Sequence, residues 1–334
     1  MPHAGPHGTT PHKRIMSTPQ RPATTAASPE TQATEESAPF LVYAKLVGSV
    51  TLWGGTWIAG RYLAQHITPF PAAFIRFAIA SIFLLWLTKR VEGRLPGLNR
   101  TNWLQLALLG LTGVFAYNAF FFTGLQTTTA GRAALIVAAI PAVLSVYSAI
   151  VLKEPFPPRK IAGVLLSFLG VALIVSDGNP AALFDQGLSR GDLAIFGCVA
   201  SWSVYTLAGR RAMTRFSPHT SVTWSCVLGS LFLLIPALAN DLPQVTFHAG
   251  WLDWLCFIYL GVFATGMAFS WYYEGVKAVG PSRAGVFINL VPVTAVVLGF
   301  LILGEPLSHS LLAGGGMVMA GVWLTNRPVK KRNC

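Results

Sequence analysis

Charged residues are scarce in this chain of 334 residues: Asp, Glu, Lys and Arg make up 11% of it, whereas hydrophobic residues make up 53%. An average soluble domain carries roughly 25% charged residues. So few charges exclude both a disordered chain and an ordinary soluble enzyme. The hydrophobic residues come in runs of about 20, the length that an α-helix needs to cross ~30 Å of hydrocarbon. The composition therefore predicts a helical membrane protein that crosses the bilayer several times.

Motifs of catalysis and metal binding are absent as well. The sequence has no HExxH, no GxSxG, no paired aspartates within an apolar run, and no glycine-rich loop that ends in Lys-Ser or Lys-Thr. The four cysteines have no CxxC spacing; three lie within apolar runs and the fourth is the last residue. We interpret them as packing residues rather than disulfide partners. We therefore expect no enzyme, no cofactor and no metal site.

The chain contains an internal repeat. Residues 102–155 align without a gap with residues 253–306, 151 positions further on. The matched pairs include Trp103 with Trp254, Gly110 with Gly261, Gly124 with Gly275, Arg132 with Arg283, Pro141 with Pro292, and Glu154-Pro155 with Glu305-Pro306. Chance does not align a Trp, an Arg, a Pro and a Glu-Pro pair in one ungapped frame. The sequence therefore predicts a duplicated unit.

Ten apolar runs predict ten transmembrane helices. Their ranges are 44–63, 71–88, 102–123, 131–151, 158–176, 191–209, 218–238, 252–274, 284–303 and 309–325. Each half holds an odd number of helices, so the second half enters the membrane from the opposite side. We therefore predict an all-α membrane protein made of two inverted five-helix repeats.

The predicted domains follow from this division. The repeats cover residues 41–177 and 191–326, and a linker over 178–190 joins them. Residues 1–40 are rich in Pro, Thr, Ala and Ser and lack the apolar core of a signal peptide, so we predict a disordered tail. Residues 327–334 form a basic tail.

Positive charges gather in alternate connections between the predicted helices. If the N-terminus is cytoplasmic, the outer loops hold only Arg61, Arg132 and Arg190. The inner loops and tail hold Lys89, Arg90, Arg94, Arg100, Lys153, Arg159, Lys160, Arg210, Arg211, Arg215, Lys277, Arg283, Arg327, Lys330, Lys331 and Arg332. Such asymmetry is typical of the positive-inside rule and predicts two cytoplasmic termini. It accounts for most of the net charge of +12, so the lipid bilayer is the expected partner and nucleic acid is not.

Arg76 is the candidate charge for substrate binding. It lies about six residues into the second predicted helix, roughly 9 Å below the outer surface. An Arg at the helix centre costs about 2.5–3.5 kcal/mol on insertion scales. In a cavity Arg76 would hold an anionic group such as a carboxylate; alternatively it snorkels outward or pairs with a carbonyl. The matching position of the second repeat is Ser225, so this charge is not a symmetric feature of the scaffold.

Aromatic side chains are candidates for the walls of a cavity, since rings stack on apolar or aromatic parts of a substrate while hydroxyl and indole N–H groups orient it. The interfacial belt of a membrane protein is the alternative. The candidate substrate-binding aromatics are Trp53 and Trp57 on one helix face, Trp202 with Tyr205 in the matching helix, Tyr117 in the third helix and Trp271 in the eighth.

Two amides and two prolines interrupt the apolar runs. Asn118 and Asn289 must hydrogen-bond to a neighbouring helix or to a substrate. Pro141 and Pro292 each free a carbonyl one turn earlier. Such a break offers a polar group or a hinge at a transport site, or it is a simple packing kink.

Other features favour a scaffold interpretation. Glu274 and Lys277 have the i, i+3 spacing of an ion pair, with a proton-coupling carboxylate as the alternative. Arg132 recurs at the start of a predicted helix in both repeats. The glycine-rich stretches 163–170 and 314–321 predict close helix packing, within the chain or across a homodimer.

The repeated motifs resemble those of the drug/metabolite transporter superfamily, in particular its EamA-type members. The resemblance covers residues 43–326 and rests on Arg132-Ala133, Pro141, Glu154-Pro155, Ala162-Gly163 and Gly170-Val171, with Arg283-Ala284, Pro292, Glu305-Pro306, Ala313-Gly314 and Gly321-Val322 in the second half. It implies a ten-helix permease of the inner membrane, commonly an exporter of amino acids or related metabolites that works by alternating access.

We therefore expect a secondary transporter of small molecules in the bacterial cytoplasmic membrane, with its site near the midplane between the halves. Two alternatives stay open. One is an importer of a nucleobase, a vitamin or a sugar-derived metabolite. The other is a membrane scaffold or sensor that binds without transporting.

Overall fold

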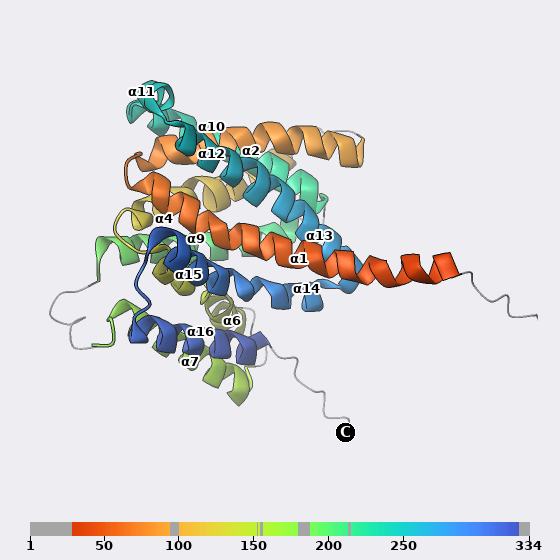
Figure 1. The fold of residues 1–334 in the computed structure, drawn as a ribbon, viewed down its shortest axis with the longest axis vertical. Helices are drawn as coiled ribbons and strands as arrows, with labels where there is room; N and C mark the ends of the chain where they lie inside the picture. The colour runs from red at the N-terminus through yellow and green to blue at the C-terminus, as the bar shows by residue number, and fades with distance from the viewer. Residues whose placement is uncertain are drawn as a thin grey trace, which may run out of the picture. The chain divides into compact units, whose positions relative to one another are not determined.

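Every regular element in the described part of the chain is helical (Figure 1). The computed structural model describes residues 29–93, 100–151, 153, 156–179, 188–212 and 215–326, and from Leu41 onward they belong to one unit. The predictions for residues 1–28, for Glu154-Pro155, for most of the linker and for the tail 327–334 lie outside the described residues.

The elements follow the predicted apolar runs closely. They are α1 (Pro29–Ala64), α2 (Pro69–Glu92), α3 (Arg100–Leu109), η1 (Gly110–Ala116), α4 (Tyr117–Leu125), α5 (Ala130–Val137), α6 (Ile140–Ile150), α7 (Pro158–Val175), α9 (Arg190–Ala212), α10 (Pro218–Ala239), α11 (Leu242–His248), α12 (Trp251–Ile258), η2 (Tyr259–Met267), α13 (Ala268–Val279), α14 (Pro281–Ile288), α15 (Leu290–Leu303) and α16 (His309–Asn326). Element α1 begins within the range predicted as a tail, where residues 30–38 are rich in the helix formers Glu, Gln and Ala.

Eight helical segments of the described chain are long and apolar enough to cross a membrane. They begin at Pro69, Trp103, Ala130, Pro158, Arg190, Pro218, Trp251 and Arg283. The structure therefore confirms an all-helical protein with several membrane spans. It does not give the full ten, because the predicted first and last spans are less apolar: α1 carries Lys45 and several Gly, Thr and Trp residues, and α16 carries three consecutive glycines.

Prolines and hydroxyl side chains set where several helices begin. A proline occupies the first turn of α2, α7, α10 and α14, where its missing N–H costs no hydrogen bond. Thr129 Oγ1 accepts a hydrogen bond from Arg132 N and Ser217 Oγ accepts one from Thr220 N, which caps α5 and α10. At the other ends, Gly93 and Gly304 adopt the left-handed backbone that stops α2 and α15.

The two halves share the same irregularities at matching positions. A π-helical segment ends at Ala116 in the first half and at Met267, 151 residues later, in the second. The next residue donates its N–H five residues back in both, from Tyr117 to Thr112 O and from Ala268 to Phe263 O. The helix break before the repeated proline, Pro141 or Pro292, also matches, because α5 ends at Val137 and α14 ends at Ile288, 151 residues later.

The glycine-rich stretches pack against one another within the chain. Helices α7 and α16 lie side by side (Figure 1), and a Cβ on Gly163 would lie 2.7 Å from Gly321 O. A Cβ on Gly170 would lie 2.6 Å from Gly314 O. Only glycine allows two helix backbones to approach so closely. The close packing predicted from the glycines is therefore a contact between the last helix of each repeat.

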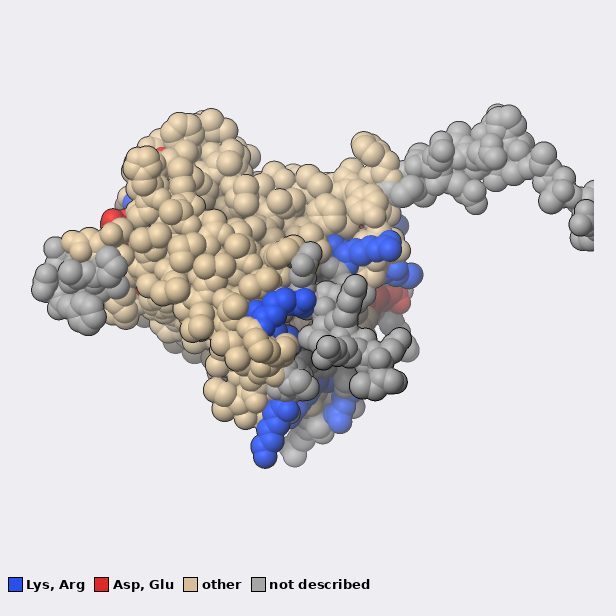
Figure 2. Space-filling view, turned by 90° about the horizontal axis from the view of Figure 1, so that it is seen from below, with Lys and Arg blue, Asp and Glu red and all other residues tan. Residues whose placement is uncertain are grey.

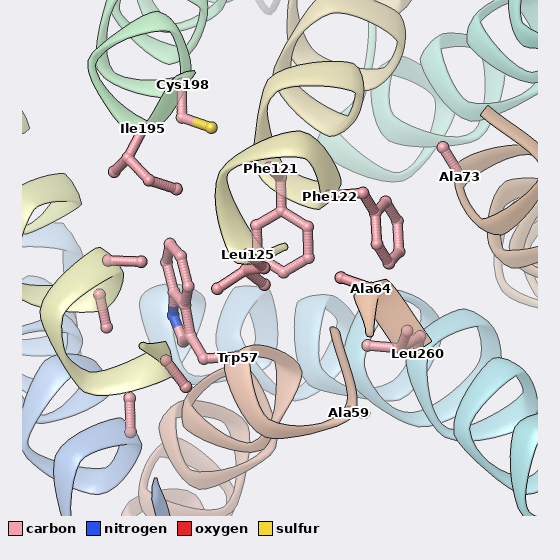
Figure 3. Packing of buried hydrophobic residues seen from close by; sticks show 14 of the residues in the cluster. Trp57, Ala59, Ala64, Ala73, Phe121, Phe122, Leu125, Ile195, Cys198 and Leu260 are labelled. Carbon is pink, nitrogen blue, oxygen red and sulfur yellow. The ribbon is translucent and has the colours of Figure 1, made fainter. Parts of the chain in front are cut away.

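The apolar core is centred on α1, α4 and α9. Figure 3 shows the indole of Trp57 pointing from α1 toward Phe121 and Leu125 of α4, with Ile195 and Cys198 of α9 opposite. The ring centroids of Trp57 and Phe121 are 5.1 Å apart. Two members of this cluster, Trp57 and Phe121, also line the cavity described below.

Basic side chains are unevenly distributed over the surface. In the view of Figure 2, most Lys and Arg gather toward the lower right, beside a broad area that shows neither acidic nor basic side chains. A face without charge beside a basic margin is the surface that a bilayer requires.

The packing of α7 on α16 yields a stability prediction. Gly321→Ala places a Cβ 2.5 Å from Gly163 O, so we expect a loss of about 1–3 kcal/mol in the free energy of unfolding from overpacking. Gly316→Ala, on the same helix, has nothing within 4 Å of the new Cβ, and we expect no loss, or a gain of up to about 1 kcal/mol from helix propensity. Thermal unfolding of both variants in detergent tests this. Equal stability of the two variants would contradict the helix contact.

Candidate functional site

A cavity of about 460 Å³ lies among the helices of both halves. It brings together ten of the eleven residues that the sequence indicated for the site. These are Trp53, Trp57, Arg76, Tyr117, Asn118, Pro141, Trp202, Tyr205, Asn289 and Pro292. The residues of the first repeat lie on α1, α2, α4 and α6. Those of the second repeat lie on α9 and α15, with Asn289 directly before α15.

Trp271 lies away from this cavity. Its ring packs against Gly48 of α1, and the next two residues, Tyr272 and Tyr273, line the cavity instead. The side chains of successive helix residues point roughly 100° apart, so sequence neighbours lie on different faces of the helix. A run of three aromatics therefore does not tell, by itself, which ring faces the cavity.

Arg76 contributes the one charge among the described residues that line the cavity. Its side chain does not reach the surface, since the residue is only 8% exposed. Nη1 donates a hydrogen bond to Asn118 Oδ1 at 3.0 Å, and no hydrogen-bond partner for Nε is present in the described part of the chain. The guanidinium carbon also lies 4.9 Å from the ring centroid of Phe77 and 5.8 Å from that of Phe121.

Asn118 holds Arg76 in place through the irregular helix beside it. Its Nδ2 donates to Val114 O at 2.9 Å, a carbonyl within η1, and this bond leaves Oδ1 directed at the guanidinium. The amide thus bridges the π-helical segment of the first repeat and the charge on α2.

The second π-helical segment plays a similar part. Ala268 N–H donates to Phe263 O rather than to Ala264 O, and Ala264 O accepts the indole N–H of Trp53 at 3.0 Å. Such π-helical irregularities are frequent at functional sites. Hydrophobic periodicity did not reveal these segments, because one extra residue barely shifts the apolar pattern.

Aromatic rings form the walls of the cavity in two groups. On one side the rings of Tyr117 and Trp202 are 5.2 Å apart, and those of Trp202 and Tyr205 are 4.9 Å apart. On the other side Trp53 lies 5.2 Å from both Phe269 and Tyr272. The two groups leave a space with flat apolar walls, suited to a planar or elongated apolar body.

Several lining residues were not expected from the sequence. Thr56, Thr206, Thr265 and Phe269 line the cavity without having stood out in their apolar runs. Ser225 also lines it, and its position could have been inferred because it matches Arg76 in the other repeat. Among the described residues, no group of three or more His, Cys, Asp or Glu could hold a metal ion.

Beyond Trp57 the bundle is closed by polar contacts, here called the Arg132 end. Arg132 binds both oxygens of Asp192 at 2.9 and 2.7 Å, Asp177 at 3.1 Å and Val175 O at 2.7 Å. Glu305 accepts hydrogen bonds from Ala130 N and Gly131 N at the start of α5. The scaffold interpretation of Arg132 agrees with these contacts.

The opposite end of the bundle, here called the Lys45 end, carries an ion pair of Glu274. The spacing in the sequence had predicted Lys277 as its partner. Glu274 accepts a hydrogen bond from Lys45 of α1 at 2.6 Å rather than from Lys277. The i, i+3 spacing makes Lys277 a neighbour, but a cation on a helix packed alongside offers shorter contact. The predicted partner was therefore wrong, although Glu274 does form an ion pair.

Comparison with known proteins gives one consistent result. The model of the EamA-like transporter family matches twice, over residues 41–176 and 189–327. The uncharacterized transporter YyaM of Bacillus subtilis is 28% identical over 84% of this chain and 92% of its own length. An uncharacterized transporter of Archaeoglobus fulgidus is 32% identical over 83% of this chain and 94% of its own. A crystal structure with 21% identity, covering 85% of this chain and 97% of that one, shares the fold with a TM-score of 0.58.

The Arg132 end yields a prediction that separates buried from exposed ion pairs. Arg132→Met leaves Asp192, whose side chain is 1% exposed, without its cation, and we expect a loss of about 3–5 kcal/mol in the free energy of unfolding. Glu274→Gln removes an ion pair whose side chains are 31% and 53% exposed, and we expect a loss below about 1 kcal/mol. Unfolding in mixed micelles, followed by tryptophan fluorescence, measures both. If Arg132→Met left the free energy of unfolding unchanged, the scaffold role of Arg132 would be contradicted.

Proposed function

The chain belongs to the EamA-like transporter family, and we propose that it is a secondary transporter that exports small carboxylate-bearing metabolites, amino acids or related compounds, through the Arg76 cavity. The observation that carries the proposal is the buried guanidinium of Arg76 in an aromatic cavity between the two repeats. A buried cation with an unpaired N–H is a site for an anionic group, and a carboxylate matches its planar donors.

The internal repeat supports alternating access as the mechanism. Each repeat contributes a helix with a π-helical segment and a helix broken before a proline, and both kinds of helix line the cavity. In a ten-helix, inverted arrangement, exchange of the two halves' conformations would turn the cavity from one side of the membrane to the other. The breaks at Pro141 and Pro292 are the proposed hinges.

The bacterial cytoplasmic membrane, with both termini in the cytoplasm, is the proposed location. The distribution of basic residues over alternate connections supports this orientation. The Arg132 end would then face outward and the Lys45 end inward. In that orientation the polar contacts of Arg132, Arg61 and Glu305 close the outer side.

Counterflow in proteoliposomes tests the proposal. Vesicles are preloaded with one solute from a panel of amino acids, aromatic acids, nucleobases and sugars, and uptake of the labelled solute is measured. We expect carboxylates to exchange, and Arg76→Gln to raise the half-saturating concentration about 10- to 100-fold, because a hydrogen bond to a charged group contributes about 1.5–3 kcal/mol. Arg76→Lys retains the charge but not the planar donors, so we expect an intermediate effect.

The matched control is Trp271→Phe, because Trp271 has the same aromatic character as the cavity residues but lies outside the cavity. It should leave exchange unchanged. Exchange restricted to nucleobases, vitamins or sugars would reject the carboxylate role of Arg76. No exchange of any solute by protein that remains folded would reject transport in favour of a scaffold or sensor.

A further inference from the structure

We propose that the preferred substrate is a net anion: a carboxylate on a flat apolar body, without the ammonium group of an amino acid. This inference rests on the proposed transport function and narrows its substrate class. It follows from a count of the charges that the cavity offers and of those that are already neutralised elsewhere.

The described carboxylates with hydrogen-bond or ion-pair partners find them at the helix ends, and Asp241, which has no partner among the described residues, is exposed. None of them lines the cavity. Glu92 binds the hydroxyls of Ser217 and Thr220, Asp177 and Asp192 bind Arg132, Asp253 binds His66 and Gly250 N, Glu274 binds Lys45, and Glu305 binds Ala130 N and Gly131 N. In the described part of the chain, no salt bridge includes Arg76.

Arg76 therefore brings an uncompensated positive charge to the cavity. Its one hydrogen bond goes to the neutral amide oxygen of Asn118, which orients the guanidinium without neutralising it. Nε is buried and, within the described residues, unpartnered. A bound carboxylate would supply the missing negative charge and accept hydrogen bonds from two guanidinium nitrogens.

An ammonium group would find no anionic partner, because none of the described residues that line the cavity is acidic. The hydroxyls of Thr56, Thr206, Ser225 and Thr265 donate to backbone carbonyls of their own helices. Their oxygens could accept from an ammonium group, but they are neutral and would not compensate its charge. Aromatic faces attract cations, but a zwitterion adds no net charge and leaves the positive charge of Arg76 uncompensated overall. The cavity therefore favours a ligand with net charge of −1.

The charge of the substrate also bears on the direction of transport. If an anion leaves the cell without an accompanying cation, one negative charge moves outward in each cycle. A membrane potential that is negative inside drives this movement. Net export would then need no coupling carboxylate in the cavity, in agreement with the positions of the described acidic residues.

Three solutes that share a phenylethyl body test the inference: 3-phenylpropionate has only the carboxylate, phenethylamine only the ammonium, and phenylalanine both. Counterflow of each is measured with the full chain in proteoliposomes, with protein-free vesicles as the control for passive leak. We expect 3-phenylpropionate to exchange at least tenfold faster than phenylalanine at equal concentration, and phenethylamine not to exchange. Arg76→Gln should abolish the preference.

A second measurement addresses net charge directly. A potassium gradient with valinomycin imposes a potential across vesicles loaded with 3-phenylpropionate, and an interior-negative potential should accelerate its net efflux. The net-anion inference is overturned if the rate of efflux does not depend on the potential, or if phenylalanine exchanges as fast as 3-phenylpropionate. Neither result would contradict the proposed transport function. If none of the three solutes exchanges while others of the panel do, the inference also fails; if nothing in the panel exchanges, the proposed function fails with it.

Discussion

The hydrogen bond from Arg76 to Asn118 is the contact around which the cavity is organised. It holds a cation in the interior of an apolar bundle, where an isolated charge is unfavourable. The amide of Asn118 is oriented by its own hydrogen bond to Val114 O in η1. The irregular helix and the amide thus position the charge, and aromatic side chains surround it.

The second repeat supplies the same architecture without the charge. In its π-helical segment Ala264 O accepts the indole N–H of Trp53, and Ser225 occupies the position that matches Arg76. The duplicated scaffold therefore carries an asymmetric cavity, with one guanidinium and otherwise neutral, mostly apolar walls. The polar contacts of the Arg132 end and the glycine contact of α7 with α16 belong to the scaffold and not to the site.

Much of this could be predicted from the sequence because hydrophobic runs, prolines and the repeat are local or periodic signals. They located the helices and selected Trp53, Trp57, Arg76 and Asn118 as residues that line a cavity. Features that depend on neighbours in space could not be predicted. How the helices pack decides that Tyr272 and not Trp271 faces the cavity. It also decides that Glu274 pairs with Lys45 and not with Lys277. The π-helical segments depend on single backbone hydrogen bonds that leave no compositional trace.

The central claim is that Arg76 is an uncompensated charge whose counter-ion is the substrate. Thermal unfolding of the wild type and of Arg76→Gln, each with and without 3-phenylpropionate, tests it most directly. The account predicts that Arg76→Gln without ligand is at least as stable as the wild type, since removing an unpaired buried charge relieves its desolvation. The ligand should stabilise only the wild type, by about 2.7 kcal/mol at a hundredfold excess over Kd. A variant that is strongly destabilised without ligand, or that gains as much from the ligand as the wild type, would contradict this account.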